Sequence, residues 1–381
     1  MKYFYGRQHI DQSDIRYTLR VLKSNFLTQG PIVNDFEKKL KKNFGAKYAI
    51  AVSSGSAALH LLAKALNWNN KDTIATTPIT FAATANCIEH VGAKLELIDI
   101  EDETYNLDPN ILEHKCKKLS KIGKKFKAVI AIDYAGQPCD WESLSYLSKK
   151  YSFQLINDNC HAIGAHYNKS PHYAAKYALA ATHSYHPVKN ITTGEGGSIL
   201  TNNRKIRDKV KQFRSHGIIR YASKDPWFYK INEIGFNYRL TDFQAALGIS
   251  QLKKLNKFIL KRNQIAQFYN SYFKFNEKVK LPIVKKNVKH SYHLFPLLLN
   301  FKEIKKNKNQ IFKELSKKKI NLQVHYIPLH FHNYYKKKYN FSKGDFPVSE
   351  NFYSREISLP IYFDLKLKDQ KYICEQILNI L

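Results

Sequence analysis

Short apolar runs alternate with stretches of helical periodicity through the first two thirds of the chain, and this alternation constrains the fold more than any other feature. The apolar runs are YAIAVSS (48–54), TIATTPIT (73–80), KLELIDI (94–100), KAVIAIDYAG (127–136), FQLINDNC (153–160) and SILTNN (198–203). Helical spacing is found in 32–45, 56–66, 81–92 and 142–151. Strands that are apolar throughout are buried on both faces, so the pattern predicts an α/β domain with a largely parallel sheet.

The character of the sequence changes near residue 256, where a long Lys-rich helical segment departs from the sheet pattern. The segments that follow are strand-like HLFPLLLNF (293–301), helical QIFKELSKKK (310–319) and strand-like NLQVHYIP (321–328). A single hydrophobic core usually stops growing at ~250–300 residues, and this chain has 381. We therefore predict a large α/β domain over 1–255 and a smaller α+β domain over 256–381.

Composition excludes several classes of protein. Hydrophobic residues make up 44% of the chain, which is enough to build a sizeable core and excludes a disordered protein. No apolar run reaches the roughly 18–20 residues that a bilayer requires. The N-terminal MKYFYGRQHIDQSD has no apolar signal core. We expect a cytoplasmic protein without a membrane span.

Neither the cysteines nor the histidines are spaced as metal ligands. The five cysteines are odd in number and scattered, so we expect reduced, mostly buried thiols. His325, His330 and His332 fit no usual zinc pattern and are interpreted as structural or substrate-facing. We expect no metal. The cysteines are Cys87, Cys116, Cys139, Cys160 and Cys374.

The net charge of +31 raises the hypothesis of a nucleic-acid-binding protein. However, 52 of the 62 basic residues are Lys, whereas base readout and bidentate phosphate contacts favour Arg. The lysines are densest between Lys253 and Lys343, in runs that are typical of a solvated face. We expect no nucleic-acid partner, although a positive surface would steer anionic substrates toward the protein.

Four polar features lie at predicted carboxyl ends of strands, where open parallel sheets bind ligands. The turn Ser53–Ala58 (SSGSAA) opens a helix, and it is either a simple helix cap or a phosphate cradle. Asp158 follows the run FQLI and precedes His161 by three residues. A carboxylate at this place is a helix cap, a metal ligand or the partner of a cationic ring nitrogen.

Lys189 lies in the segment SYHPVKNITTGEGG, between apolar residues and a Gly-rich turn. Desolvation lowers the pKa of a lysine and makes its amine nucleophilic, as Schiff-base chemistry requires. The alternative is an ordinary surface lysine before a turn. A fourth feature, GFNYRLTDFQAA (235–246), is a Gly-flanked loop with Asn237 and Arg239 before a helix, either a cap or a ligand loop.

Together these motifs resemble the DegT/DnrJ/EryC1/StrS family of pyridoxal phosphate (PLP) dependent nucleotide-sugar aminotransferases. The resemblance runs from FLTQGP near residue 26 to ISLPIY near residue 357. The matching motifs are SSGSAALHL, TTPITFAATAN, DNCHAIGA, SYHPVKNITTGEGG, RSHG and GFNYRLTDFQAALG. IDYAGQP, SYHPVKNITTGEGG and LQVHYIPLH are most similar to the branch that acts in pseudaminic acid synthesis. The resemblance implies a large PLP-binding domain of the aspartate aminotransferase type (fold type I).

The resemblance also implies roles for individual residues. Lys189 would form the Schiff-base linkage to PLP and shuttle the proton, and Asp158 would keep the pyridine nitrogen protonated. Phe81 would stack on the ring, with His161 on or near its other side. The phosphate contacts would come from the amides of Ser56 and Ala57, the hydroxyl of Ser184 and, from a second subunit, Asn237.

The active site would thus belong to a homodimer. His325 and Tyr326 lie in a segment that resembles the substrate side of the cleft. The implied reaction moves an amino group from L-glutamate, which leaves as 2-oxoglutarate, to C4 of a nucleotide-linked 4-keto-6-deoxy sugar.

The chain departs from the family pattern at two places. Many members have Asn-Gly-Thr where this chain has Ser54-Gly55-Ser56, and many have Gln where His161 stands. Ser keeps the hydroxyl and the backbone donors, and His is a familiar alternative to Gln. Members that act as dehydratases replace the lysine with His, so the presence of Lys189 favours transamination.

Two alternatives stay open on the sequence alone. One keeps the chemistry but changes the substrate to a dTDP- or GDP-linked ketosugar, since only the pocket distinguishes these. The other is a PLP-binding regulator or a basic nucleic-acid-binding protein without transaminase activity.

Overall fold

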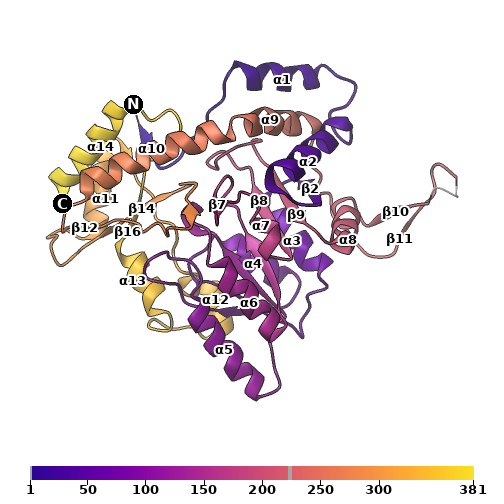
Figure 1. Cartoon of the computed structure of the whole chain (residues 1–381), viewed down its shortest axis with the longest axis horizontal. Coiled ribbons are helices and arrows are strands. Elements are labelled where there is room, and N and C mark those ends of the chain that lie inside the picture. The colour runs from indigo at the N-terminus through magenta and orange to yellow at the C-terminus, as the bar shows by residue number, and fades with distance from the viewer. Residues whose placement is uncertain (1, 222–224) are drawn as a thin grey trace.

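The computed structural model describes residues 2–221 and 225–381, and a seven-stranded sheet lies at the centre of this described part (Figure 1). The strands lie in the order β2-β9-β8-β6-β5-β3-β4, and β9 runs antiparallel to both neighbours in an otherwise parallel sheet. The predicted α/β fold with a mostly parallel sheet is therefore confirmed. The bounds are β2 Tyr48–Val52, β3 Thr73–Thr76, β4 Lys94–Leu97, β5 Ala128–Ile132, β6 Gln154–Asp158, β8 Ala180–Ser184 and β9 Gly197–Thr201.

Each of the six apolar runs overlaps one strand of this sheet, but the pattern did not reveal β8. Its sequence, AATHS, lacks the large apolar residues by which the other strands are found. In the sheet, Ala180 pairs with Ile156 of β6, and Thr182 pairs with Ile199 of β9. Large side chains on the neighbouring strands thus stand beside the small residues of β8.

Helices cover both faces of the sheet, because alternate strand residues pack into two separate apolar clusters. On one face Phe36 of α2 and Trp141 of α6 pack with the strand residue Val129, and on the other Leu61 of α3 packs with Ile130. The helices of the first face are α2 Pro31–Phe44, α5 Pro109–Lys121, α6 Trp141–Tyr151, α7 Ala174–Tyr177 and α9 Asp242–Lys253. Those of the second are α3 Gly55–Ala65, α4 Ala82–His90, α8 Arg204–Arg214 and α12 Asn333–Tyr339.

The C-terminal part has a small antiparallel sheet of its own, in the order β12-β14-β16, with a separate apolar cluster behind it. The N-terminal strand β1 (Tyr3–Phe4) pairs in parallel with β15 (Ile320–Asn321), so the first residues lie beside this part of the molecule. The domain boundary at 255/256 stays a prediction. The remaining bounds are α10 Leu255–Phe273, β12 Val279–Lys280, β14 Phe295–Leu299, α11 Lys308–Lys317, α13 Pro347–Arg355, β16 Glu356–Leu359 and α14 Leu367–Ile380, with β7 His166–Tyr167 pairing β13 Val288–Lys289.

The strand expected over 321–328 is confined to Asn321 at the end of β15. Beyond it, one backbone bridge joins Gln323 to Ser358 of β16. The amide of His325 instead donates to the carboxylate of Glu356, at 3.0 Å. Side chains therefore take over hydrogen bonds that a neighbouring strand would supply, and the chain runs as an irregular segment toward the central sheet.

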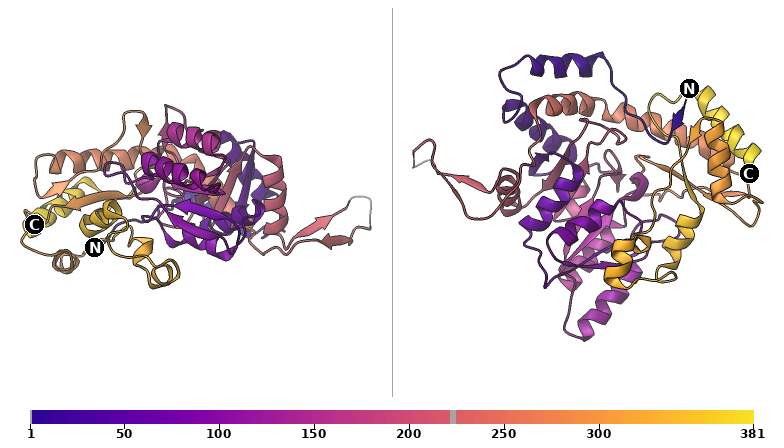
Figure 2. Two further views of the ribbon diagram at one scale, coloured as in Figure 1. Left: turned by 90° about the horizontal axis from the view of Figure 1, so that it is seen from below. Right: turned by 180° about the vertical axis from the view of Figure 1, so that it is seen from behind.

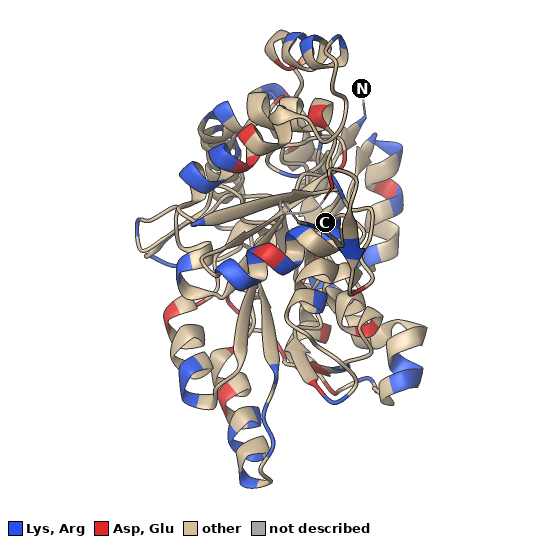
Figure 3. Ribbon diagram, turned by 90° about the vertical axis from the view of Figure 1, so that its right-hand side faces the viewer, with Lys and Arg blue, Asp and Glu red and all other residues tan. Residues whose placement is uncertain are grey.

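Two elements stand apart from the layered body. Helix α1 (Gln12–Leu22) lies alongside α9, and the hairpin of β10 (Ile218–Arg220) and β11 (Tyr229–Ile231) projects far beyond the rest of the molecule (Figures 1 and 2). On the side shown in Figure 3, Lys and Arg are distributed over many separate helices and loops rather than along one stripe. No helix in the described ranges is long and apolar enough to cross a membrane.

Candidate active site

A cavity of about 520 Å³ opens at the carboxyl ends of β2, β6 and β8. It brings together eight of the residues singled out from the sequence, although these are spread over 270 positions from Ser56 to Tyr326. The eight are Ser56, Phe81, Asp158, His161, Ser184, Lys189, His325 and Tyr326. Lining residues that the sequence analysis did not select include Tyr5, Thr84, Glu195, His293 and Gln323.

Lys189 lies in the loop between β8 and β9, where its amide donates to the carbonyl of His186 at 2.9 Å. Its Nζ lies 3.4 Å from Nε2 of His293. Burial of the amine lowers the pKa of Lys189, while Cys160 and Asp158 act in the opposite direction. The surroundings therefore favour the neutral, nucleophilic form of this amine more than water does.

Asp158 ends β6 and is 5% exposed. One carboxylate oxygen accepts a hydrogen bond from the hydroxyl of Thr84, at 2.7 Å, and the other accepts from the amide of Cys160, at 3.2 Å. Thr84 lies on α4, and its hydroxyl is also 2.9 Å from that of Thr80. These contacts fix the orientation of a carboxylate that lines the cavity, and the contact of Thr84 with Asp158 is one that only tertiary structure could reveal.

The N-terminus of α3 faces the same cavity. The side chain of its N-cap residue, Ser54, accepts a hydrogen bond from the amide of Ala57 at 3.0 Å. The amides of Gly55 and Ser56 come before the first intrahelical hydrogen bond and so have no partner within the helix. A Cβ at Gly55 would lie 2.8 Å from the Cβ of Ser184. Glycine thus lets the helix start approach β8 closely, as an anion bound between free amides and the Ser184 hydroxyl requires.

Aromatic side chains form the other walls. The Tyr326 hydroxyl lies 3.0 Å from Nε2 of His161, whose ring lies 4.5 Å from that of His293. Burial, followed by the charge of Lys189, holds the pKa of His161 well below its usual range, so this imidazole is neutral. Phe81 is 59% exposed at the N-terminus of α4, with its ring 6.0 Å from that of Tyr326.

Asn237 does not line the cavity of its own chain. It forms a backbone bridge with Ser215, and the next carbonyl, that of Tyr238, accepts a hydrogen bond from the amide of Ser53. Its loop therefore lies beside the strand end that leads to the N-terminus of α3. A contact of Asn237 with the active site of a second subunit stays a prediction.

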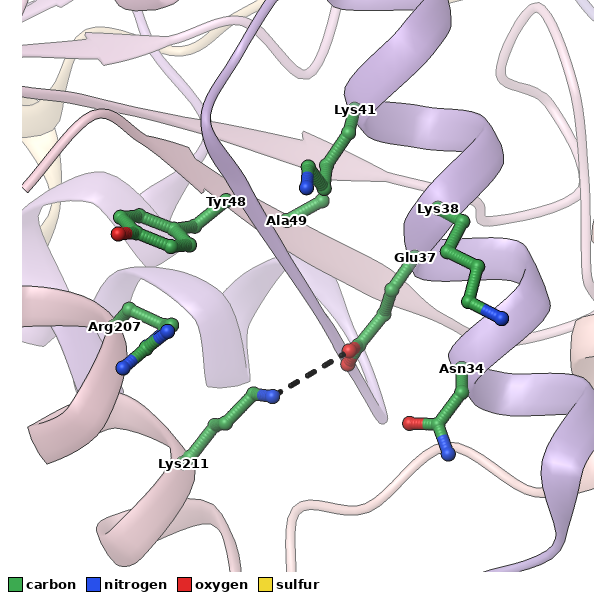
Figure 4. A pocket seen from close by; sticks show the side chains of 8 residues that line it. All are labelled: Asn34, Glu37, Lys38, Lys41, Tyr48, Ala49, Arg207 and Lys211. Atoms are coloured by element: carbon green, nitrogen blue, oxygen red, sulfur yellow. Dashed lines mark ion pairs between the residues drawn. The ribbon is translucent and has the colours of Figure 1, made fainter. Parts of the chain in front are cut away.

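Figure 4 shows a second hollow, of about 380 Å³, between α2, β2 and α8. Its carboxylate, Glu37, is already held by Nη1 of Arg214 and by the amide of Ala51, at 2.8 and 2.9 Å. Lys211 lies 4.0 Å from Glu37, and Arg207 stacks on the ring of Tyr48. The carboxylate of this hollow thus already has protein partners, whereas Asp158, Ser184 and Lys189 all line the open space of the first cavity.

The first cavity fits the functional groups of pyridoxal 5′-phosphate. Lys189 offers a deprotonatable amine for the aldehyde, Asp158 a carboxylate for the pyridine nitrogen, and α3 with Ser184 a site for the phosphate. Within the described residues, no group of three or more His, Cys, Asp or Glu is placed to hold a metal ion. Fold and site together define a pyridoxal-phosphate-dependent enzyme.

Comparison with known proteins narrows this class. The chain belongs to the DegT/DnrJ/EryC1/StrS aminotransferase family, which matches residues 8–378. It is 40% identical over 377 residues to UDP-4-amino-4,6-dideoxy-N-acetyl-beta-L-altrosamine transaminase of Campylobacter jejuni, covering 99% of this chain and 97% of the relative. GDP-perosamine synthase of Escherichia coli O157:H7 is 30% identical, with 95% and 93% covered.

Among solved structures, Helicobacter pylori PseC superposes with a TM-score of 0.91 at 34% identity, over 100% of this chain and 99% of that one. PseC is an aminotransferase involved in the biosynthesis of pseudaminic acid. The chain is therefore a sugar-nucleotide aminotransferase, and its cofactor is pyridoxal 5′-phosphate.

Proposed function

We propose that the enzyme transfers the amino group of L-glutamate to C4 of a UDP-linked 4-keto-6-deoxy-N-acetylamino sugar, giving UDP-4-amino-4,6-dideoxy-N-acetyl-beta-L-altrosamine for pseudaminic acid biosynthesis. The observation that carries the proposal is the Lys189–Asp158 site in a chain similar over its whole length to transaminases of this name. The positive charge of the molecule agrees with an anionic nucleotide substrate.

The residues divide this work among them. When bound, the cofactor withdraws electrons from the substrate carbon that exchanges its proton. The Lys189 amine carries that proton, and Asp158, oriented by Thr84, holds the proton on the ring nitrogen. The Ser184 hydroxyl and the amides of Ser56 and Ala57 would bind the phosphate, with the Ala57 amide shared with the side chain of Ser54. Phe81 and His161 enclose the ring and exclude water, and His325 and Tyr326 contact the sugar nucleotide.

We further propose that the enzyme works as a homodimer in which Asn237 completes the neighbouring active site. The hairpin that precedes Asn237 exposes large apolar residues: Trp227 is 74% and Ile234 77% exposed. Such side chains on a projecting arm fit a surface that a second copy covers. Helix α1 adds Ile15, Leu19 and Leu22, each 46–48% exposed.

The first experiment is a visible absorption spectrum of the purified protein with pyridoxal phosphate, before and after L-glutamate. The proposal predicts a visible absorption band of the bound cofactor that L-glutamate bleaches. When UDP-, dTDP- and GDP-linked 4-ketosugars are then added one at a time, only the UDP-linked sugar should restore the band. A band indifferent to every amino donor would instead support the PLP-binding regulator.

The second candidate is the same reaction on a GDP- or dTDP-linked ketosugar. The similarity to GDP-perosamine synthase supports this second candidate, since that relative is also matched over nearly its whole length. Restoration of the band by a GDP- or dTDP-linked ketosugar alone would replace the UDP-linked substrate without changing the chemistry.

A further inference from the structure

Glu356 is a buried carboxylate that the reaction described above does not use. It begins β16, is fully buried, and does not line the cavity. Within residues 2–221 and 225–381 it forms no ion pair within 4 Å. Because burying a carboxylate is costly, hydrogen bonds must compensate for the burial of Glu356.

Both carboxylate oxygens of Glu356 are connected by hydrogen bonds to His325, which lines the cavity. One oxygen accepts a hydrogen bond from the backbone amide of His325, at 3.0 Å. The other accepts from the hydroxyl of Ser358, at 2.5 Å. The oxygen of that same hydroxyl lies 2.8 Å from Nδ1 of the His325 ring. Glu356, Ser358 and His325 thus form a chain of hydrogen bonds that starts outside the cavity and ends in its wall.

Counting protons along this chain decides which nitrogen of His325 is protonated. A carboxylate only accepts, so the single hydroxyl proton of Ser358 points to Glu356. The oxygen of Ser358 must then accept from Nδ1, which therefore carries the proton of the imidazole. Burial holds the pKa of His325 near 3, so the ring is neutral and Nε2 keeps its lone pair.

We propose that Glu356, acting through Ser358, is a positioning residue that holds His325 in the Nδ1-protonated tautomer and so presents Nε2 to the cavity as a hydrogen-bond acceptor. The hydroxyl of Tyr134 donates to the carbonyl of His325, at 2.5 Å, so the backbone is fixed on both sides of the ring. Nε2 then selects a hydroxyl or N–H group of the ligand, and only this last step rests on the proposed sugar-nucleotide substrate.

The surroundings of Glu356 decide when the carboxylate is ionised. Burial raises the pKa of Glu356 to about 7, against the opposing effect of the Ser358 hydrogen bond and the charge of Lys308 on α11. The Nζ of Lys308 donates to the carbonyl of Tyr353, at 2.6 Å. The other titratable groups that face the carboxylate are His325, Tyr105, Tyr134 and Tyr326. At pH 8.5 Glu356 is ionised and the hydrogen-bond chain has the direction described.

The test is Glu356→Gln, which keeps shape and size. The Gln oxygen accepts from the amide of His325, and its NH2 group donates to Ser358, which turns the Ser358 proton toward Nδ1 and moves the imidazole proton to Nε2. We expect ¹⁵N NMR of histidine-labelled protein at pH 8.5 to show His325 protonated on Nδ1 in the wild type and on Nε2 in this variant. The His325 signals are assigned by their loss in His325→Gln.

Glu350→Gln is the matched control, because Glu350 also pairs with a buried histidine, His330, at 3.1 Å, and lies outside the cavity. This control should leave the His325 signals unchanged. Two results would overturn the proposal: a wild-type His325 that is protonated on Nε2, or a Glu356→Gln variant in which His325 is still protonated on Nδ1.

Kinetics supply a second readout. With the sugar nucleotide that the enzyme accepts, Glu356→Gln should raise KM about tenfold, the effect of one misdirected hydrogen bond. Ser358→Ala should raise it similarly and Ser358→Thr should restore it. An equal rise in Ser358→Thr would show that bulk and not the hydroxyl matters at this position, which contradicts the proposal. Because the NMR arm needs no turnover, a wrong sugar assignment would leave the tautomer result standing.

Discussion

Lys189 is one of 52 lysines, and its surroundings set it apart. Its amine lies beside His293 and is desolvated, whereas lysines of the charge runs, such as Lys286 and Lys305, are exposed. We expect Lys189→Ala to lower transamination by more than about 10³-fold, because the proton shuttle and the cofactor anchor are lost together. Turnover with L-glutamate and a ketosugar nucleotide measures this. Lys176→Ala, at an exposed lysine, should keep full turnover, and an active Lys189→Ala would refute the assignment.

The environment of Asp158 makes a second prediction at the residue scale. Asp158→Asn should lower turnover by about 10²-fold or more, since a neutral amide no longer holds a proton on the ring nitrogen. Thr84→Val removes the 2.7 Å hydrogen bond to the carboxylate and should cost about tenfold. Cofactor titration and steady-state rates of both variants test this. Wild-type rates in Asp158→Asn would contradict the role given to the carboxylate.

At the scale of elements, one carboxylate joins the start of α2 to the start of α9. Asp242 is fully buried, and its oxygens accept hydrogen bonds from the amides of Gly30, Ile32 and Val33, at 2.7, 2.9 and 3.3 Å. These are the amides that a helix N-terminus leaves without an intrahelical partner. The second helix therefore caps the first across 212 positions of sequence.

Removing this cap should destabilise the folded protein. Asp242→Ala removes the acceptor of three backbone donors, of which that of Val33 is buried and the other two are part-buried. We therefore expect it to lower the free energy of unfolding by about 3 kcal/mol. Asp242→Asn keeps one acceptor and should lose less. Denaturant unfolding compares both with Asp208→Ala, which removes an exposed carboxylate on α8 and should unfold as the wild type does. An Asp242→Ala protein as stable as the wild type would disprove the cap.

At the scale of the whole molecule, buried histidines link stability to pH. Burial lowers the pKa of both His183 and His290 to about 3. A histidine in the unfolded chain becomes protonated near pH 6.5, whereas these two histidines in the folded chain stay neutral down to about pH 3. The free energy of unfolding therefore falls as the pH drops below about 6.5. Each such histidine should cost about 2 kcal/mol between pH 7.5 and pH 5.

The variant His183→Gln isolates one of these contributions. The Gln amide can still donate to Oδ1 of Asn159, which lies 3.0 Å from Nε2 of His183. The loss of unfolding free energy between pH 7.5 and pH 5 should shrink by about 2 kcal/mol in this variant. An unchanged pH dependence would mean that His183 is protonated within the fold.

The exposed hairpin makes a prediction about assembly. We expect light scattering after gel filtration to give the mass of two 44.4 kDa chains. The double variant Trp227→Ser, Ile234→Ser should shift this mass toward that of one chain, because it loses exposed apolar area that a partner covers. Ile122→Ser, at another exposed apolar residue, should leave the dimer intact. Asn237→Ala should keep the dimer and weaken cofactor binding. A monomeric wild type with full activity would refute the shared site.

Local sequence signals were sufficient to predict the sheet and the chemical residues at its edge. Buried parallel strands need apolar side chains on both faces, and helix starts favour Gly and Ser, so both leave a local signal in the sequence. These signals predict the sheet and place Asp158 and Lys189 at one edge of it. The strand β8 gave no such signal, because neighbouring strands supply the large side chains that pack beside its small residues.

The groups that orient the site come from distant positions of the chain and meet only through packing of the folded molecule. Thr84 reaches Asp158 across 74 positions, His293 reaches Lys189 across 104, and Glu356 reaches the amide of His325 across 31. No periodicity marks these residues, since a hydrogen bond between separate elements depends on how the elements pack and not on local spacing. The irregular path of 322–328 has the same cause: side-chain hydrogen bonds replaced the strand pairing that its apolar pattern predicted.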